Sequence, residues 1–307
     1  MFKEEYRWTD IQGTIMGITN IVIIGNGTDE RSKYFPELWE TSKSTILKIT
    51  SSTELDKVNI SLTNRSTDSY SEISLLGEAD DILGRYINET SVVSIDISSL
   101  DHHIIMYLCN LLCMKLRPKN LFATYAEPIE YLRQSTYGEF NLSSGSRGVY
   151  DVPSLIRFPK YKDIHLAAFL GFEGERLKKI IEENSEIKKV FPVIGFPSFR
   201  PGWQSRALRN SMNVLQTPEV STEIHKCEAC SIYSAYESIN RIASMSEART
   251  QFALSPLGTR PHTAACAIYA SIHQDALILY DFPVEVCPIS RGVLTCIGYN
   301  LSCFIKR

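Results

Sequence analysis

Charged and hydroxyl side chains gather where an apolar stretch of the sequence ends. The apolar run 21–24 is followed by Gly25-Asn26-Gly27, and then by Asp29, Glu30, Arg31 and Ser32. Glycines permit a tight turn and a close approach of the backbone to another group. Acids, a base and a hydroxyl in a loop after a strand could bind a phosphorylated ligand, although the pattern is neither GxGxxG nor a P-loop.

The position of a proline decides whether these side chains belong to a loop or to a helix. Proline is favoured at the first position of a helix and is costly inside one. We therefore expect the next helix to begin near Pro36, which leaves residues 28–35 as a loop whose side chains face a ligand. A capped and solvated loop is the alternative interpretation.

Two further candidate segments follow apolar runs in the first half of the chain. Asp96 lies inside an apolar strand, where an unpaired carboxylate would be costly, and Ser98 follows it where an anion could meet the next helix. Tyr125 and Glu127 lie at the end of another strand, where a tyrosine could stack on a base and hydrogen-bond it. Helix capping by the serine and packing of the aromatic ring are the alternatives.

The second half of the chain offers two similar segments. Glu173 opens a helix after a strand that ends in glycine, where backbone N–H groups suit a phosphate. Arg200 and Arg206 lie close together in sequence, and arginine forks suit phosphates. Acids in a first helical turn and ordinary surface arginines would explain the same residues.

The sixth segment combines a turn glycine, a base and a proline at a helix start. Gly258 makes the turn, Thr259, Arg260 and His262 follow it, and Pro261 suits the first helical position. A cation and a hydroxyl beside a helix N-terminus could bind an anion.

Apolar strands alternate with longer helical segments along the whole chain. Strands are expected at 20–25, 44–51, 58–63, 91–98, 120–128, 163–172, 188–197, 250–258 and 275–284, and helices at 79–90, 100–116, 173–184, 203–215, 230–247 and 260–273. This alternation predicts an α/β fold with two Rossmann-like lobes, whose mostly parallel sheets are flanked by helices. Ligands collect beyond the carboxyl ends of such strands, so all six segments are expected to line one cleft.

A polar stretch divides the two lobes. Residues 134–150 contain four serines, three glycines and no apolar periodicity, which favours a boundary and gives lobes of 1–145 and 146–307. A surface loop within one domain is the alternative. The last 20 residues are expected to form a terminal strand or hairpin.

Composition restricts the partners that the chain could have. The 32 bases and 35 acids among 307 residues give a net charge of −3, so we expect no direct binding of duplex nucleic acid and no membrane association. No apolar run reaches the roughly 18–20 residues of a membrane span, and no secretion signal is evident, which predicts a cytoplasmic protein. The cysteine spacing predicts no metal site, no HExxH or GxSxG motif occurs, and no cofactor is expected.

The sixth segment, with the strand after it, resembles the last crossover of CARF-like Rossmannoid ligand-sensing domains. In such domains a Gly-Thr-Lys-type turn before a helix lines a site for cyclic or linear oligonucleotides; here Gly258, Thr259 and Arg260 occupy that turn. The loop after residues 21–24 lies where the same family often places hydroxyls. The resemblance implies a nucleotide-signal sensor in prokaryotic antiviral defence.

Three functions stay open on this sequence. The chain could bind a nucleotide or another phosphorylated small molecule without catalysis and act through a protein partner or homo-oligomer. It could be a hydrolase or transferase acting on such a ligand, because acids, tyrosines and arginines would also serve bond cleavage. It could be a non-catalytic structural subunit of a larger complex.

Overall fold

The computed structural model describes residues 5–7, 10–27, 29–63, 67–132, 142–285 and 289–306. The chain divides into two compact units: a first unit of residues 1–132 and 287–307, and a second unit of residues 133–286. The predicted lobes of 1–145 and 146–307 differ from these units both at the boundary and at the C-terminus. Residues 290–300 pair with a strand of the first unit, so the end of the chain returns there instead of completing the second lobe.

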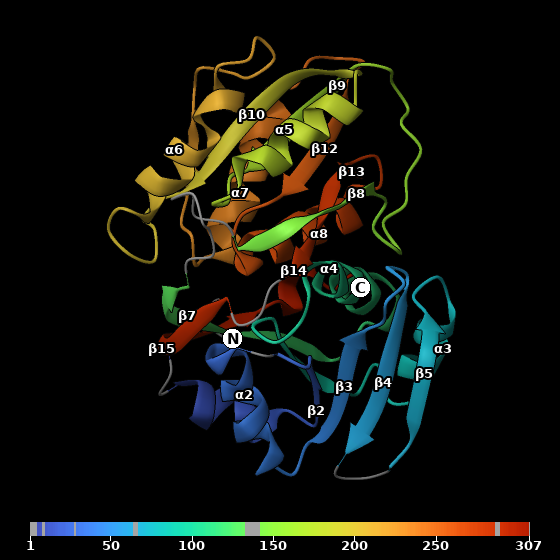
Figure 1. Ribbon diagram of the computed structural model, residues 1–307. Helices are drawn as coiled ribbons and strands as arrows, with labels where there is room; N and C mark the ends of the chain where they lie inside the picture. The colour runs from blue at the N-terminus through green and yellow to red at the C-terminus, as the bar shows by residue number, and fades with distance from the viewer. Residues whose placement is uncertain are drawn as a thin grey trace. The chain divides into compact units, whose positions relative to one another are not determined.

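The first unit is built on an eight-stranded mixed sheet (Figure 1). Its central strands β3, β2, β6 and β7 are parallel, whereas β4, β5, β15 and β1 add to its sides in antiparallel pairs. In sheet order the strands are β1 (Glu5–Arg7), β15 (Ser290–Asn300), β7 (Asn120–Tyr131), β6 (Val92–Asp96), β2 (Ile21–Ile24), β3 (Thr45–Ser51), β4 (Lys57–Thr63) and β5 (Ser69–Ser74).

Two helical crossovers of the first unit run in opposite directions across the sheet. The chain passes from β2 through α2 to β3 on one side, and from β6 through α4 to β7 on the other. Because such crossovers are right-handed, the two helices cover opposite faces of the sheet. The helical elements are η1 (Ile11–Met16), α2 (Glu30–Glu40), α3 (Glu78–Gly84), α4 (His102–Asn110), η2 (Leu111–Leu116) and η3 (Ser302–Phe304).

The second unit contains a five-stranded sheet in which every pair is parallel. Its strand order is β11-β10-β9-β12-β13, so the chain moves outward from β9, returns, and continues on the other side. The elements are β9 (Ile164–Phe169), α5 (Gly174–Glu183), β10 (Ile187–Gly195), α6 (Trp203–Leu215), β11 (His225–Cys227), α7 (Ile232–Ser244), β12 (Gln251–Pro256), α8 (Arg260–Ile272) and β13 (Leu277–Ile278). A separate antiparallel ribbon joins β8 (Ser143–Tyr150) to β14 (Tyr280–Glu285).

The expected α/β architecture is confirmed, and most elements lie where apolar patterning places them. Strands β2 and β9 are buried at every residue, as continuous apolar runs in covered parallel sheets require. The helix expected over 203–215 is α6, with the same bounds. No helix in the described part of the chain is long and apolar enough to cross a membrane.

Two predictions about elements are wrong in detail. The single strand expected over 275–284 is two short strands in different sheets, β13 beside β12 and β14 beside β8. The polar segment 134–150 is not all loop, because residues 143–150 form β8; its earlier part, 134–141, lies outside the described residues. Serine and glycine give β8 no apolar alternation, so pairing with β14 decides its conformation.

The start of α2 corrects the interpretation of Pro36. The helix begins at Glu30, with Asp29 at the N-cap, and Pro36 lies inside it. A proline there removes the bond that a backbone N–H would donate to the carbonyl of Ser32, four residues earlier. Contacts made by the first turn and by Phe35 and Trp39 outweigh this local cost, so residues 30–35 are helix and not loop.

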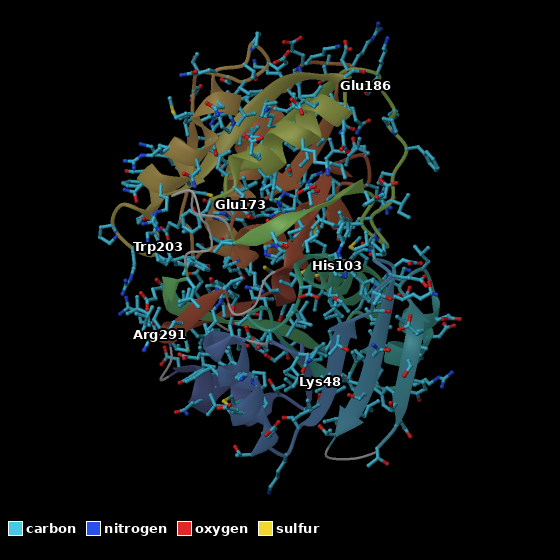
Figure 2. The ribbon with its side chains drawn as sticks, in the orientation of Figure 1. Lys48, His103, Glu173, Glu186, Trp203 and Arg291 are labelled. Atoms are coloured by element: carbon cyan, nitrogen blue, oxygen red, sulfur yellow. The ribbon has the colours of Figure 1, made fainter. Side chains whose placement is uncertain are left out.

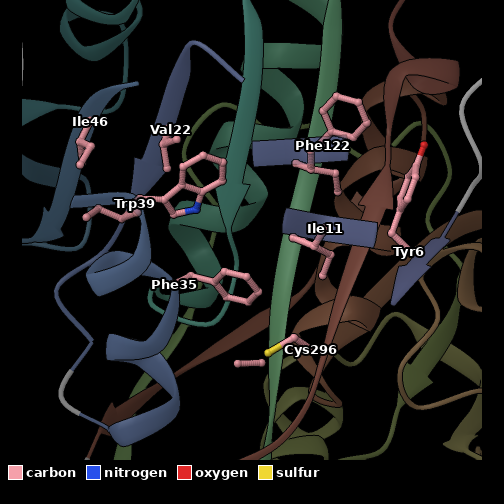
Figure 3. Close-up of a cluster of buried hydrophobic side chains, with 11 residues drawn as sticks. Tyr6, Ile11, Val22, Phe35, Trp39, Ile46, Phe122 and Cys296 are labelled. Carbon is pink, nitrogen blue, oxygen red and sulfur yellow. The ribbon is translucent and has the colours of Figure 1, made fainter. Parts of the chain in front are cut away.

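A cluster of buried side chains holds α2 and η1 against one face of the first unit's sheet (Figure 3). Phe35 and Trp39 of α2 and Ile11 of η1 are fully buried, and they meet Val22 and Phe122 from the central strands. Burial of such rings supplies much of the free energy that keeps α2 on the sheet.

Removing the largest ring of this cluster tests its role. We expect Trp39→Ala to lower the free energy of unfolding by about 3–5 kcal/mol, because a cavity replaces a fully buried indole. Glu37→Ala, on the exposed side of the same helix, should change it by less than about 0.5 kcal/mol. Urea unfolding measures both; equal effects of the two substitutions would contradict the packing described.

Candidate functional site

The predicted candidate residues of the first half lie at the carboxyl edge of the first unit's parallel strands. The strand order reverses between β2 and β6, and ligands bind at such reversal points in open α/β sheets. The loops that follow these two strands touch: the N–H of Gly25 donates to Ser99 Oγ at 2.8 Å. A Cβ atom on Gly25 would overlap the carbonyl oxygen of Ser99. The close backbone approach expected at this glycine is therefore made by the protein itself.

Arg31 is the main cation of this edge, and it is almost entirely withdrawn from water. Its side chain is 2% exposed. One Nη1 donates to the hydroxyl of Tyr125 at 3.0 Å and to that of Tyr131 at 3.4 Å, and the guanidinium carbon lies 5.8 and 5.3 Å from the centroids of the same two rings. Hydroxyls and ring faces are neutral partners, so these contacts orient the guanidinium without balancing its charge.

The nearest carboxylate to Arg31 does not complete its hydrogen bonds. Asp29 Oδ2 lies 3.9 Å from Nε, which is within ion-pair reach but outside hydrogen-bond distance. Among the described residues, Nε has no hydrogen-bond partner. Burial alone would disfavour the cation, but the oxygens of Tyr131, Tyr125 and Asp29 outweigh it and raise the pKa of Arg31 above its ordinary value.

Asp29 accepts hydrogen bonds from the start of β15 and from the residue before it. Its carboxylate accepts the N–H of Ile289 at 2.7 Å, and the N–H and hydroxyl of Ser290 at 3.4 and 2.9 Å. These bonds explain why Asp29, although it lies at the N-cap of α2, makes no capping bond to that helix. The side chain joins α2 to β15.

The neighbours of Arg31 in the sequence face in different directions. Glu30 is exposed and accepts the N–H of Gly292 at 2.7 Å. Ser32 is buried, 3% exposed, and packs against Gly27. Of the four polar residues expected to face a ligand from one loop, Arg31 alone combines a buried charge with an incomplete set of hydrogen bonds.

Asp96 and Ser98 form a second buried group beside this one. Asp96 Oδ1 accepts the N–H of Ser98 at 3.0 Å, and Ser98 Oγ accepts the N–H of Ala126 at 2.7 Å. Both side chains are fully buried. Burial, followed by the charge of Asp96, raises the pKa of the Cys296 thiol to about 12. The hydrogen bond from Ala126 to Ser98 joins the loop after β6 to β7.

Tyr125 and Glu127 extend the same edge along β7, and both are buried. Sequence analysis did not select Tyr131 or Ser290 as site residues. Tyr131 lies at the end of a strand that continues past the expected end at 128, and the alternation of Tyr125, Glu127 and Tyr131 on one side of an extended chain is the signal that could have identified it. Ser290 reaches the site only through the pairing of β15 with β7, which sequence patterning does not reveal.

In the second unit, Glu173 binds the ribbon and not an open helix end. Its Oε1 accepts the N–H of Leu142 at 3.1 Å, and the N–H and hydroxyl of Ser143 at 2.8 and 2.6 Å (Glu173 is labelled in Figure 2). Arg176, one turn later on α5, donates from Nε to Asp281 Oδ2 at 3.0 Å and from Nη2 to the Asp281 carbonyl. These charges fasten β8 and β14 to α5.

The two arginines predicted in the fifth segment are not brought into a common cluster by the described contacts. Arg200 is half-buried, and its carbonyl oxygen accepts the hydroxyl of Ser198 at 2.5 Å. Arg206 is exposed on α6. Their part in ligand binding stays a prediction.

Thr259 and His262 close the start of α8 in a capping box. The Thr259 N–H donates to His262 Nδ1 and the His262 N–H donates to Thr259 Oγ1, both at 3.4 Å. The Thr259 hydroxyl donates to the carbonyl of Ala229 at 2.7 Å. Gly258 is required here, since a Cβ on it would lie 2.6 Å from Nδ1. Arg260 is buried as the first residue of the helix. The hydroxyl of Thr259 and the imidazole of His262 thus bind the chain itself.

His262 carries its proton on Nε2. Because Nδ1 accepts a hydrogen bond, Nε2 is the donor to the carbonyl of Glu228, 3.1 Å away. Burial lowers the pKa of His262 to about 4. Cys227 Sγ lies 3.4 Å from Nε2, but burial raises the pKa of this thiol to about 12. A neutral thiol beside a neutral imidazole is not an activated nucleophile.

The described residues hold no group of three or more His, Cys, Asp or Glu side chains that could bind a metal ion. Neither the protein-family models nor the curated protein sequences that we searched match this chain. The candidate site is therefore interpreted from its geometry.

The imidazole of His262 predicts a pH dependence of stability. Its pKa is about 4 when folded and 6.5 ordinarily, so as pH falls the unfolded chain takes up this proton first. The contribution of His262 to the free energy of unfolding is therefore complete above pH 6.5. It falls by about 3 kcal/mol as pH drops to about 4. Urea unfolding at pH 7 and pH 4.5 measures the loss for the native chain and for His262→Gln, and the loss should be about 2–3 kcal/mol smaller in the variant. Equal losses would contradict the neutral, buried imidazole.

Proposed function

We propose that the protein binds a small phosphorylated ligand of the nucleotide class at the carboxyl edge of β2, β6 and β7, with Arg31 as its anion anchor. The incomplete coordination of the Arg31 guanidinium carries this proposal. A buried charge requires both a counter-charge and hydrogen bonds, and phosphate oxygens supply both to an arginine.

The second unit supplies an internal comparison. Arg176 is also buried, but its Nε bonds the Asp281 carboxylate at 3.0 Å and a second carboxylate, that of Glu173, lies 3.8 Å from Nη1. Those partners explain Arg176 as a structural cation. In the described part of the chain, Arg31 has two neutral hydroxyls and one carboxylate at 3.9 Å, which leaves donors for a ligand.

The chemistry around Arg31 favours a nucleotide over a simple inorganic anion. The half-buried Tyr131 places an aromatic ring next to the cation, and aromatic rings stack on bases. The strand orders of the two units suit Rossmann-like lobes, in which ligands bind at reversal points of this kind. The resemblance to CARF-like domains would make the protein a signal sensor in prokaryotic antiviral defence that acts with a partner protein.

Ligand binding can be tested directly on the full chain. Mass spectrometry of the denatured protein identifies any nucleotide that co-purifies. Thermal unfolding is then followed with inorganic phosphate, mononucleotides, dinucleotides and short linear and cyclic oligonucleotides. A ligand present at 100 times its Kd should stabilise the protein by about 2.7 kcal/mol, which raises Tm by several degrees.

Arg31→Lys should raise the apparent Kd of the ligand at least tenfold, because an ammonium cannot reproduce the two parallel hydrogen bonds of a guanidinium. Arg291→Lys is the matched control: Arg291, labelled in Figure 2, is a 70% exposed arginine of the same unit. The proposal fails if no member of the panel shifts Tm, or if the two variants respond to the ligand alike.

A further inference from the structure

The most exposed large apolar side chain among the described residues lies in the segment between β8 and β9. Phe158 is 93% exposed, and its neighbours Ile156 and Tyr161 are 40% and 39% exposed. Full burial of a phenylalanine contributes about 1.5–3 kcal/mol, so an aromatic ring left in water at this level indicates a surface that binds something.

The backbone around Phe158 is held in place from both sides. On one side Val152 and Leu155 are buried, 1% and 3% exposed, and the N–H of Leu155 donates to the carbonyl of Val152 at 3.0 Å. On the other side the N–H of Lys160 donates to the side chain of Gln251 at 2.7 Å, and Gln251 is itself buried. Phe158 is therefore displayed by an anchored segment.

One residue of this anchor has a costly backbone conformation. Ser154 has a φ of +68°, a left-handed conformation that costs a residue other than glycine about 1 kcal/mol or more. Surrounding contacts keep it there. Strain of this kind is retained where a neighbouring segment must be presented in one conformation.

Basic side chains alternate with the exposed apolar ones. Arg157, Lys160 and Lys162 carry three positive charges, and no acid occurs between residues 152 and 162. Arg157 donates from Nη1 to the carbonyl of Ile156 at 3.0 Å, while its buried Nε has no hydrogen-bond partner in the described ranges. The segment thus offers three cations to an anionic partner.

The basic segment is narrow. Asp163 ends it, and Glu186, whose carbonyl accepts the N–H of Ile164 at 2.8 Å, lies beside the start of β9; both acids are exposed. Acids on its border would repel a broad anionic surface such as a lipid bilayer or a duplex. A nucleic-acid single strand is narrow enough to contact the basic side chains and avoid the two acidic ones.

We propose that residues 156–162 bind single-stranded nucleic acid. Bases stack on Phe158 and Tyr161, and the phosphates lie against Arg157, Lys160 and Lys162. Aromatic stacking joined to basic side chains is the arrangement that proteins use for single strands without sequence preference. This site belongs to the second unit and does not depend on the ligand proposed at Arg31.

Fluorescence anisotropy of the full chain tests the proposal. The probes are fluorescein-labelled 20-nucleotide oligo-dT and oligo-rA, a DNA duplex of equal length, and an acidic poly-glutamate peptide, at several salt concentrations. The native chain should bind both single strands more tightly than the duplex and the peptide. Phe158→Ala should weaken single-strand binding about tenfold, as loss of one stacked base does, and Phe158→Trp should restore it.

Charge and exposure have their own controls. The double variant Lys160→Gln, Lys162→Gln should flatten the dependence of log K on log salt by about 1.4, since each phosphate contact to a single strand contributes about 0.7. Leu76→Ala, a 59% exposed apolar residue of the first unit, and Lys178→Gln, a 45% exposed lysine of the second, should leave binding unchanged. The proposal is overturned if single strands do not bind at low salt, if the duplex or the acidic peptide binds as tightly, or if Phe158→Ala binds like the native chain.

Discussion

The guanidinium of Arg31 and the carboxylate of Asp29, two positions apart, tie together the elements that form the carboxyl edge of the first unit. Arg31 binds the hydroxyls of Tyr125 and Tyr131 on β7, and Asp29 binds the backbone of β15 at Ser290. These contacts connect the first turn of α2 to a central strand and to a strand that returns from the far end of the chain. The same contacts fix the positions of residues 29–31 immediately after the β2 loop. This is consistent with α2 starting at Glu30 despite Pro36.

Much of the fold could be predicted from the sequence, because the strands and helices of an α/β protein each require a characteristic spacing of apolar residues. Fully covered parallel strands need unbroken apolar runs, such as β2 and β9. A helix on one face of a sheet needs a one-sided apolar stripe, as α5 has with Leu177 and Ile180. Pairing partners leave no such imprint. The β8 strand is polar, and the return of residues 290–300 to the first unit depends on contacts with β7 that lie far away in sequence.

The candidate site was partly predictable for the same reason. Residues that follow parallel strands must lie at one edge of the sheet, and Arg31 lies near both Asp29 and Tyr125 there. Residue type did not reveal which polar side chains form hydrogen bonds within the protein and which are available to a ligand. Thr259 and His262 have the composition of an anion site, yet they cap a helix and bind the carbonyls of Ala229 and Glu228. A polar side chain near a helix start serves either role, and only the distances distinguish them.

The central claim is that the described residues do not give Arg31 a full set of partners, and the free energy of unfolding of Arg31→Met measures this most directly. Asp29 keeps its bonds to Ile289 and Ser290 without the arginine, so the substitution does not strand a bare carboxylate. An under-coordinated buried cation exchanged for an apolar side chain of similar length should leave the unliganded protein as stable as before, or more stable by about 1–4 kcal/mol. A loss of about 3–5 kcal/mol, the usual result of breaking a buried ion pair, would show instead that the protein itself balances the charge of Arg31, and would contradict the account.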